Sequence, residues 1–124
     1  MAETIYTKNA PDAIGPYSQA KVVGGLVFTS GQIAINPATG AVEADTIEGQ
    51  TKQVCENLKV LLEAAGTSID KAVKTVCFLK NMSDFAAFNG IYGEYFTSKP
   101  ARSCVAAKEL PKDVLVEVEV IAEV

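Results

Sequence analysis

The chain has 124 residues and contains no histidine. That absence excludes Ser-His and Cys-His nucleophile pairs and the usual histidine-based zinc, copper and iron sites. Cysteine is scarce, because only Cys55, Cys77 and Cys104 occur and no two of them have C-x-x-C spacing. This odd number argues against a disulfide framework and against a zinc site. Any catalysis must therefore come from carboxylates, tyrosine, arginine, backbone groups or water.

Long hydrophobic runs are also absent. No stretch of 18 or more apolar residues occurs, so we expect no membrane span. The first six residues lack the basic and hydrophobic regions of a signal peptide, which favours a cytoplasmic protein. The length and the ordinary composition, 48% apolar and 21% charged, predict a single domain over residues 1–124.

Positive charge is sparse. The net charge is −4, and the eleven lysine and arginine residues form no cluster. Proteins that bind nucleic acid normally carry a basic patch, so we expect no nucleic-acid partner. An acidic chain with one well-placed arginine suits a small anionic ligand better than a polyanion.

Six segments are rich in β-branched and aromatic residues and are predicted to be strands: residues 3–7, 19–23, 26–33, 71–80, 102–109 and 114–122. Gly24-Gly25 between the second and third of them predicts a tight hairpin. Residues 8–18 and 34–44 contain prolines and glycines and are expected to be loops.

Two helices are predicted between these strands. Asp45 is expected to cap the first helix together with Glu48, and Gly66 to end it. Its apolar stripe consists of Val54, Leu58, Leu61, Leu62 and Ala65. Ser83 is expected to cap the second helix, which runs to about Thr97 and buries Phe85, Phe88, Tyr92, Tyr95 and Phe96. Six strands and two helices favour an α+β fold with both helices on one face of the sheet.

The last predicted strand has one side of valines, 114, 116, 118 and 120, and another side that carries Glu117 and Glu119. If residues 110–113 form a hairpin loop, Cys104 pairs with Glu119 and Ala106 pairs with Glu117. Arg102, Cys104, Glu117 and Glu119 would then share one face, and a one-residue error in the loop would reverse this. The valine side is a candidate for the face that the helices leave uncovered, and a second copy would cover it.

The segment from Pro100 to Ala107 contains the candidate functional centre. Arg102 opens a strand two residues after Pro100, which ends the preceding helix. Its guanidinium matches a carboxylate or phosphate through two parallel hydrogen bonds. From this segment alone, an anion receptor and a structural salt bridge are equally favoured.

Three other positions each have a functional and a structural interpretation. Tyr17, after Gly15-Pro16, either contacts a ligand or covers the edge of the core. Gly31, after Ser30, marks a ligand approach or a structural bulge, and the bulge is slightly favoured. Asn89 lies on the aromatic stripe of the second helix, where a hydrogen bond to a neighbouring loop is favoured over a pocket.

Over its whole length the sequence resembles the Rid/YjgF family of reactive intermediate deaminases. The resemblance rests on segments in a fixed order: Asn9-Ala10-Pro11, 14–19, 29–33, 63–66, 100–105, Leu110-Pro111 and Val116-Glu117-Val118. It implies a chorismate-mutase-like α+β fold with a six-stranded mixed sheet. It also implies a homotrimer with three sites in the clefts between subunits.

The resemblance further implies roles for single residues. Arg102 would bind the substrate carboxylate, and Glu117, rather than Glu119, would orient or activate water. The substrate-binding wall would be completed by Tyr17, Ser30, Gly31, Asn89 and the backbone near Cys104. The implied reaction hydrolyses 2-imino acids such as 2-iminobutanoate and 2-iminopropanoate, or their enamines, to 2-keto acids and ammonia. It requires no metal and no other cofactor, because the substrate is already activated.

Three other functions compete with this one. A regulatory protein of the same fold that binds keto acids without turnover is the main alternative, and it would not require Glu117. An endoribonuclease or translation-inhibitor role, described for some relatives, is disfavoured by the net charge and the missing histidine. A chaperone-like role is neither supported nor excluded by the sequence.

Overall fold

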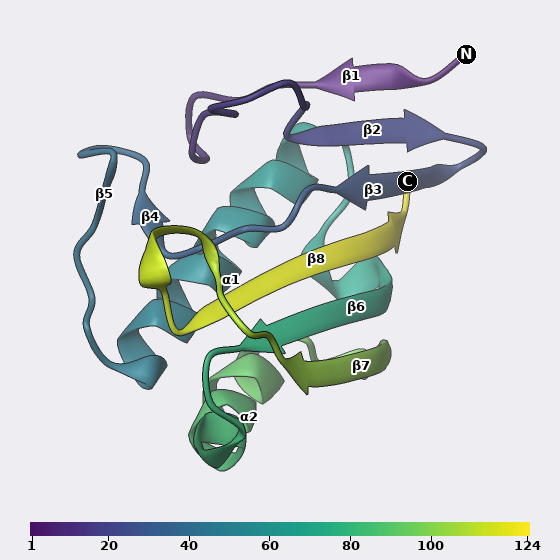
Figure 1. Cartoon of the computed structure of the whole chain (residues 1–124). Helices are drawn as coiled ribbons and strands as arrows, with labels where there is room; N and C mark the ends of the chain where they lie inside the picture. Colours follow the sequence, from purple (N-terminus) through teal and green to yellow (C-terminus); the bar gives the residue numbers. More distant parts are fainter.

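The computed structural model describes all residues 1–124 and contains a six-stranded sheet in the order β1-β2-β3-β8-β6-β7 (Figure 1). The strands are β1 Glu3–Ile5, β2 Ala20–Val23, β3 Leu26–Thr29, β6 Ala72–Leu79, β7 Ala101–Ala106 and β8 Val116–Glu123. Only β6 and β7 run parallel, and every other neighbouring pair is antiparallel. The predicted mixed sheet is confirmed.

Two helices, α1 (Ile47–Ala64) and α2 (Phe85–Tyr95), cover the same face of this sheet (Figure 1). The predicted α+β fold is therefore confirmed, and the apolar stripe of α1 is buried as expected. No helix is both long and apolar enough to span a bilayer.

The helix starts differ from the prediction. Thr46, not Asp45, caps α1, because its hydroxyl accepts a hydrogen bond from the backbone N–H of Gly49 at 3.1 Å. A 3₁₀ turn at Met82–Asp84 (η2) precedes α2, so Ser83 lies inside that turn and does not cap the helix. The first helix ends as predicted, at Gly66 with φ of 87°.

The predicted extents of one strand and one loop are also wrong. Strand β3 ends at Thr29 rather than at residue 33, and Gln32 makes only an isolated bridge to Val118. The segment predicted as the loop 34–44 contains a small hairpin of β4 (Ile35–Asn36) and β5 (Ala41–Val42). The Gly24-Gly25 hairpin is confirmed, since both glycines have positive φ and connect β2 to β3.

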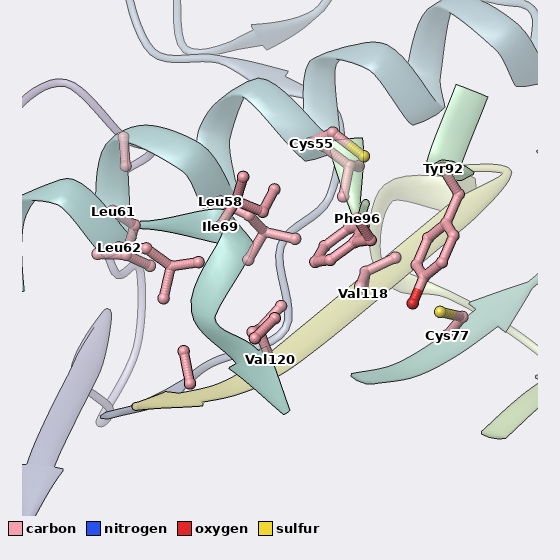
Figure 2. Close-up of a cluster of buried hydrophobic side chains, with 14 of the residues drawn as sticks. Cys55, Leu58, Leu61, Leu62, Ile69, Cys77, Tyr92, Phe96, Val118 and Val120 are labelled. Atoms are coloured by element: carbon pink, nitrogen blue, oxygen red, sulfur yellow. The ribbon is translucent and has the colours of Figure 1, made fainter. Parts of the chain in front are cut away.

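The core lies between the helices and the sheet. Figure 2 shows the side chains of α1 meeting Val118 and Val120 of β8, with Phe96 and Tyr92 beside them. All of these groups are at least nine-tenths buried. The core therefore fixes which side of β8 faces the helices.

The predicted hairpin between the last two strands is wrong, because β6 lies between β7 and β8. The connection straddles the end of β6: the N–H of Ala107 bonds the carbonyl of Leu79, and the N–H of Lys80 bonds the carbonyl of Leu115. Within the connection lies a 3₁₀ turn (η3, Pro111–Asp113), where Lys112 and Asp113 both have positive φ. The predicted pairs Cys104–Glu119 and Ala106–Glu117 therefore do not form.

The assignment of faces changes with this pairing. In the observed register Arg102 lies opposite Thr75 and Cys104 opposite Cys77, on the side that the helices cover. Glu117 lies opposite Phe78 on the other side. The valine side of β8 is buried under the helices, so the prediction that it is uncovered is wrong. The uncovered face is the glutamate side, where Phe28 and Val105 are 39% and 49% exposed.

Candidate functional site

The predicted site residues fall into two separate regions of the chain. The arginine region contains Arg102, Asn89 and Cys104, beside a pocket of about 460 Å³ between α2 and the start of β7. The glutamate region surrounds a pocket of about 360 Å³ lined by Tyr17, Ser30, Gly31 and Glu117, among others. The two pockets share no lining residue. Within one chain, the structure does not bring Arg102 and Glu117 together.

In the arginine region, the guanidinium of Arg102 lies over aromatic rings of α2. Its central carbon is 4.9 Å from the ring centre of Tyr92, 5.4 Å from Phe85 and 5.9 Å from Phe88. A cation in contact with aromatic faces is stabilised without being neutralised. The aromatic stripe predicted as core thus also serves as a platform for the arginine.

Asn89 accepts a hydrogen bond from Nη1 of Arg102 at 2.7 Å. The sequence favours a hydrogen bond between Asn89 and a neighbouring loop. The observed partner of Asn89 is Arg102 instead. The only ion pair in the chain joins Lys80 and Asp113, so Arg102 forms no salt bridge within the chain. A guanidinium has five N–H donors, and a neutral amide occupies one of them. The remaining donors suit a carboxylate ligand.

The thiols near Arg102 are poor nucleophiles. Burial raises the pKa of Cys104, and the nearby positive charge of Arg102 opposes this only in part. Burial likewise raises the pKa of Cys77 to about 12. Because the thiolate is the reactive form, both thiols are unreactive at neutral pH.

In the glutamate region, burial raises the pKa of Glu117, and the negative charge of Glu119 raises it further. Gly31 lies directly against this carboxylate, and a Cβ on Gly31 would collide with it. The N–H groups of Ser30 and Gln32 bond the carbonyls of Gln19 and Val118, whereas the N–H of Gly31 bonds no backbone carbonyl. A basic carboxylate and an unused donor therefore lie side by side.

Tyr17 and Ser30 complete the wall of this pocket. Tyr17 is 51% exposed, so its ring does not cover the core edge. The hydroxyl of Ser30 donates to the carbonyl of Ser18 at 2.6 Å, so it holds the Tyr17 loop in place. A ligand would meet the oxygen of Ser30 as an acceptor rather than as a donor.

Sequence reasoning missed Gln19, whose side chain is almost fully buried. Its amide bonds the backbone of Thr7 as donor and acceptor, at 3.0 and 2.7 Å, and donates to Pro11 at 2.8 Å. These bonds hold the loop that carries Tyr17. A glutamine directly after Gly-Pro-Tyr-Ser was the available signal, because a buried amide requires several partners. Asp12 and Lys112 also line this pocket, and no sequence pattern indicates this role for them.

The two regions offer complementary chemistry. The arginine region presents a positive charge for an anion, and the glutamate region presents a carboxylate that can accept a proton. No three His, Cys, Asp or Glu side chains gather in an arrangement that would hold a metal ion.

Comparison with known proteins shows the same fold and sequence pattern. Residues 7–124 match the family described as Endoribonuclease L-PSP. A 2-iminobutanoate/2-iminopropanoate deaminase from Salmonella typhimurium is 49% identical over 126 residues, and the match covers 98% of each chain. A RutC family protein from Pyrococcus horikoshii is 53% identical, again over 98% of each chain. The crystal structure of YyfA from Yersinia pestis, described as a conserved Rid family protein, has a TM-score of 0.97 at 50% identity and full coverage of both chains. The chain therefore belongs to the Endoribonuclease L-PSP family, which is the Rid/YjgF family that its sequence resembles.

Proposed function

We propose that this protein is an imine and enamine deaminase that hydrolyses 2-iminobutanoate and 2-iminopropanoate to 2-keto acids and ammonia. The observation that carries the proposal is the state of Arg102. Its charge is held by three aromatic rings and a neutral amide and has no carboxylate partner in the chain. A carboxylate substrate supplies the missing negative charge.

The complete site forms between copies of the chain, so the protein acts as a homotrimer. Arg102 and Glu117 lie on opposite faces of the sheet, and their pockets share no residue. In a ring of three copies related by threefold rotation, the arginine region of each copy would lie against the glutamate region of the next. Such a ring is closed and contains three equivalent sites. The uncovered sheet face, with the partly exposed Phe28 and Val105, suits contact between copies.

Arg102 binds the substrate carboxylate and thereby orients the adjacent C=N carbon. Protonation of the imine or enamine gives an iminium, which the carboxylate of Glu117 stabilises. Glu117 then accepts a proton from a water whose oxygen bonds to the C=N carbon. The proton passes from Glu117 to the amino nitrogen, and the C–N bond breaks so that ammonia leaves. The hydroxyl group then gives its proton to Glu117, and the carbonyl of the keto acid forms. The raised pKa of Glu117 makes it a stronger base than an ordinary glutamate.

The test couples a threonine dehydratase to this protein and follows the decay of the released imine. Wild type should accelerate the decay above the rate in buffer. Arg102→Ala should lose the acceleration and weaken binding of 2-oxobutanoate on the order of 100-fold, while the fold is retained. A folded Arg102→Ala protein with full activity would exclude the proposal. Binding of 2-oxobutanoate without any acceleration would instead identify a regulatory binding protein.

A further inference from the structure

Arg102 is the only arginine of the chain. One of the aromatic rings that it contacts, that of Tyr92, forms a hydrogen bond to the sheet. The hydroxyl of Tyr92 lies 2.7 Å from the hydroxyl oxygen of Thr75, in a hydrogen bond that is fully buried. In Figure 2 the hydroxyl of Tyr92 points from α2 down toward the strand that carries Cys77. Thr75 lies in β6, two residues before Cys77, and is opposite Arg102 in the pairing with β7. Three elements, α2, β6 and β7, therefore meet at one arginine.

We propose that Thr75 is a positioning residue for Arg102 and acts through the ring of Tyr92. The role in substrate binding rests on the function proposed above. The hydrogen bond sets the depth and the rotation of the ring, and the guanidinium lies 4.9 Å from the centre of that ring. The same ring stacks on Phe96, with centres 4.4 Å apart and planes 23° from parallel. Thr75 thus fixes the orientation of the donors that Arg102 presents to a carboxylate.

The hydrogen bond between Thr75 and Tyr92 favours one position of the Tyr92 ring over others. Each buried hydroxyl would lose a hydrogen bond if α2 shifted or the ring turned, and an unpaired buried hydroxyl is costly. Packing of the ring on Phe88 and Phe96 alone permits sliding, because aromatic contacts tolerate several offsets. Removing the hydroxyl of Thr75 should therefore loosen the platform while its apolar contacts remain.

This role predicts a selective effect on binding. Arg102 holds the carboxylate, whereas the base Glu117 lines the other pocket, which neither Arg102 nor Thr75 lines. Loss of the Thr75 hydroxyl should raise KM for imine and Kd for 2-oxobutanoate about 3- to 10-fold. The value of kcat at saturating substrate should change much less.

The experiment compares Thr75→Val, Thr75→Ser and Tyr92→Phe by calorimetric titration with 2-oxobutanoate. Thr75→Ser keeps the hydroxyl and should bind as wild type does. Thr75→Val combined with Tyr92→Phe should be no weaker than either single variant, because both remove the same hydrogen bond. Thr51→Val is the matched control, since Thr51 is equally buried but its hydroxyl has no hydrogen-bond partner.

A second measurement is independent of activity. With ¹⁵N-labelled arginine the folded chain gives a single Nε–H signal, that of Arg102. In wild type and in Thr75→Ser this group should be ordered, with a high heteronuclear NOE, and in Thr75→Val the NOE should fall. The proposal is overturned if Thr75→Val keeps both the ordered signal and wild-type affinity, or if Thr75→Ser is as impaired as Thr75→Val. If Arg102→Ala itself binds 2-oxobutanoate normally, the proposed function fails instead, and the NMR signal still decides the role of Thr75.

Discussion

The arginine region stabilises the charged form of its partly buried side chain, whereas the glutamate region destabilises the charged form of its own. Arg102 is surrounded by groups that stabilise its charge, namely the rings of α2 and the amide of Asn89. Glu117 lies where burial and the charge of Glu119 both disfavour its ionised form. One region is arranged to hold a fixed charge and the other to hold a proton-accepting group.

The difference fits the roles that we propose for the two regions. A receptor for a carboxylate works best when its donors are oriented in advance, because less entropy is lost on binding. A general base works best when its pKa lies nearer the working pH, and burial together with a neighbouring like charge achieves this for a carboxylate. Substitutions in the two regions should therefore separate binding from turnover.

Glu117→Gln should have the largest effect on turnover. Glutamine fills the same space but cannot accept the proton of water, so kcat should fall on the order of 100- to 10,000-fold. Binding of 2-oxobutanoate should be retained, because Arg102 is unchanged. The coupled imine assay and calorimetry measure the two quantities, and unchanged turnover would shift the role to Glu119 or to uncatalysed water attack.

The same variant should be more stable than wild type at neutral pH. The pKa of Glu117 is higher in the folded than in the unfolded chain, so ionisation destabilises the fold. This cost is absent at pH values below the unfolded pKa and is complete above the folded pKa. The difference in Tm between Glu117→Gln and wild type should thus shrink as the pH falls through this range. A difference that stays constant with pH would contradict the raised pKa.

Gly31→Ala should reduce turnover by a smaller amount. The added methyl group would collide with the carboxylate of Glu117 and displace it. We expect kcat to fall on the order of tenfold, and Kd for 2-oxobutanoate to change by less than about threefold. Equal losses in both would indicate that Gly31 contributes to binding more than to the placement of the base.

Glu119→Gln should change the pH dependence more than the rate at neutral pH. In the proposed mechanism, activity requires ionised Glu117 and is lost as the pH falls through its pKa. Removing the charge of Glu119 lowers that pKa, so the acid limb of kcat should move to lower pH. Burial still acts on Glu117, so the shift should be incomplete. An acid limb that does not move would show that the two carboxylates are not coupled.

Cys104→Ser should have the smallest effect, a change in activity of less than about twofold. The thiol is protonated at neutral pH and only half-buried, and only the backbone of this residue is assigned a role. Complete loss of turnover in a folded variant would show that the side chain takes part in the reaction.

Local structure was largely predictable from the sequence, because it depends on neighbouring residues. The Gly24-Gly25 hairpin, the buried stripe of α1 and the end of that helix at Gly66 all follow from local spacing. The anion-receptor role suggested for Arg102 also came from its local position, after a proline and at the start of a strand. The N-caps of both helices were misplaced by one residue.

Only the tertiary structure decided how the strands pair and which residues share a face. Consecutive strands usually pair, yet β6 separates β7 from β8, since the chain from Ala107 to Leu115 spans the end of β6. That single crossing places Arg102 under α2 and Glu117 on the open face, which reverses the predicted arrangement. The residues of the chain supply both halves of the proposed chemistry, but long-range pairing places them in separate regions.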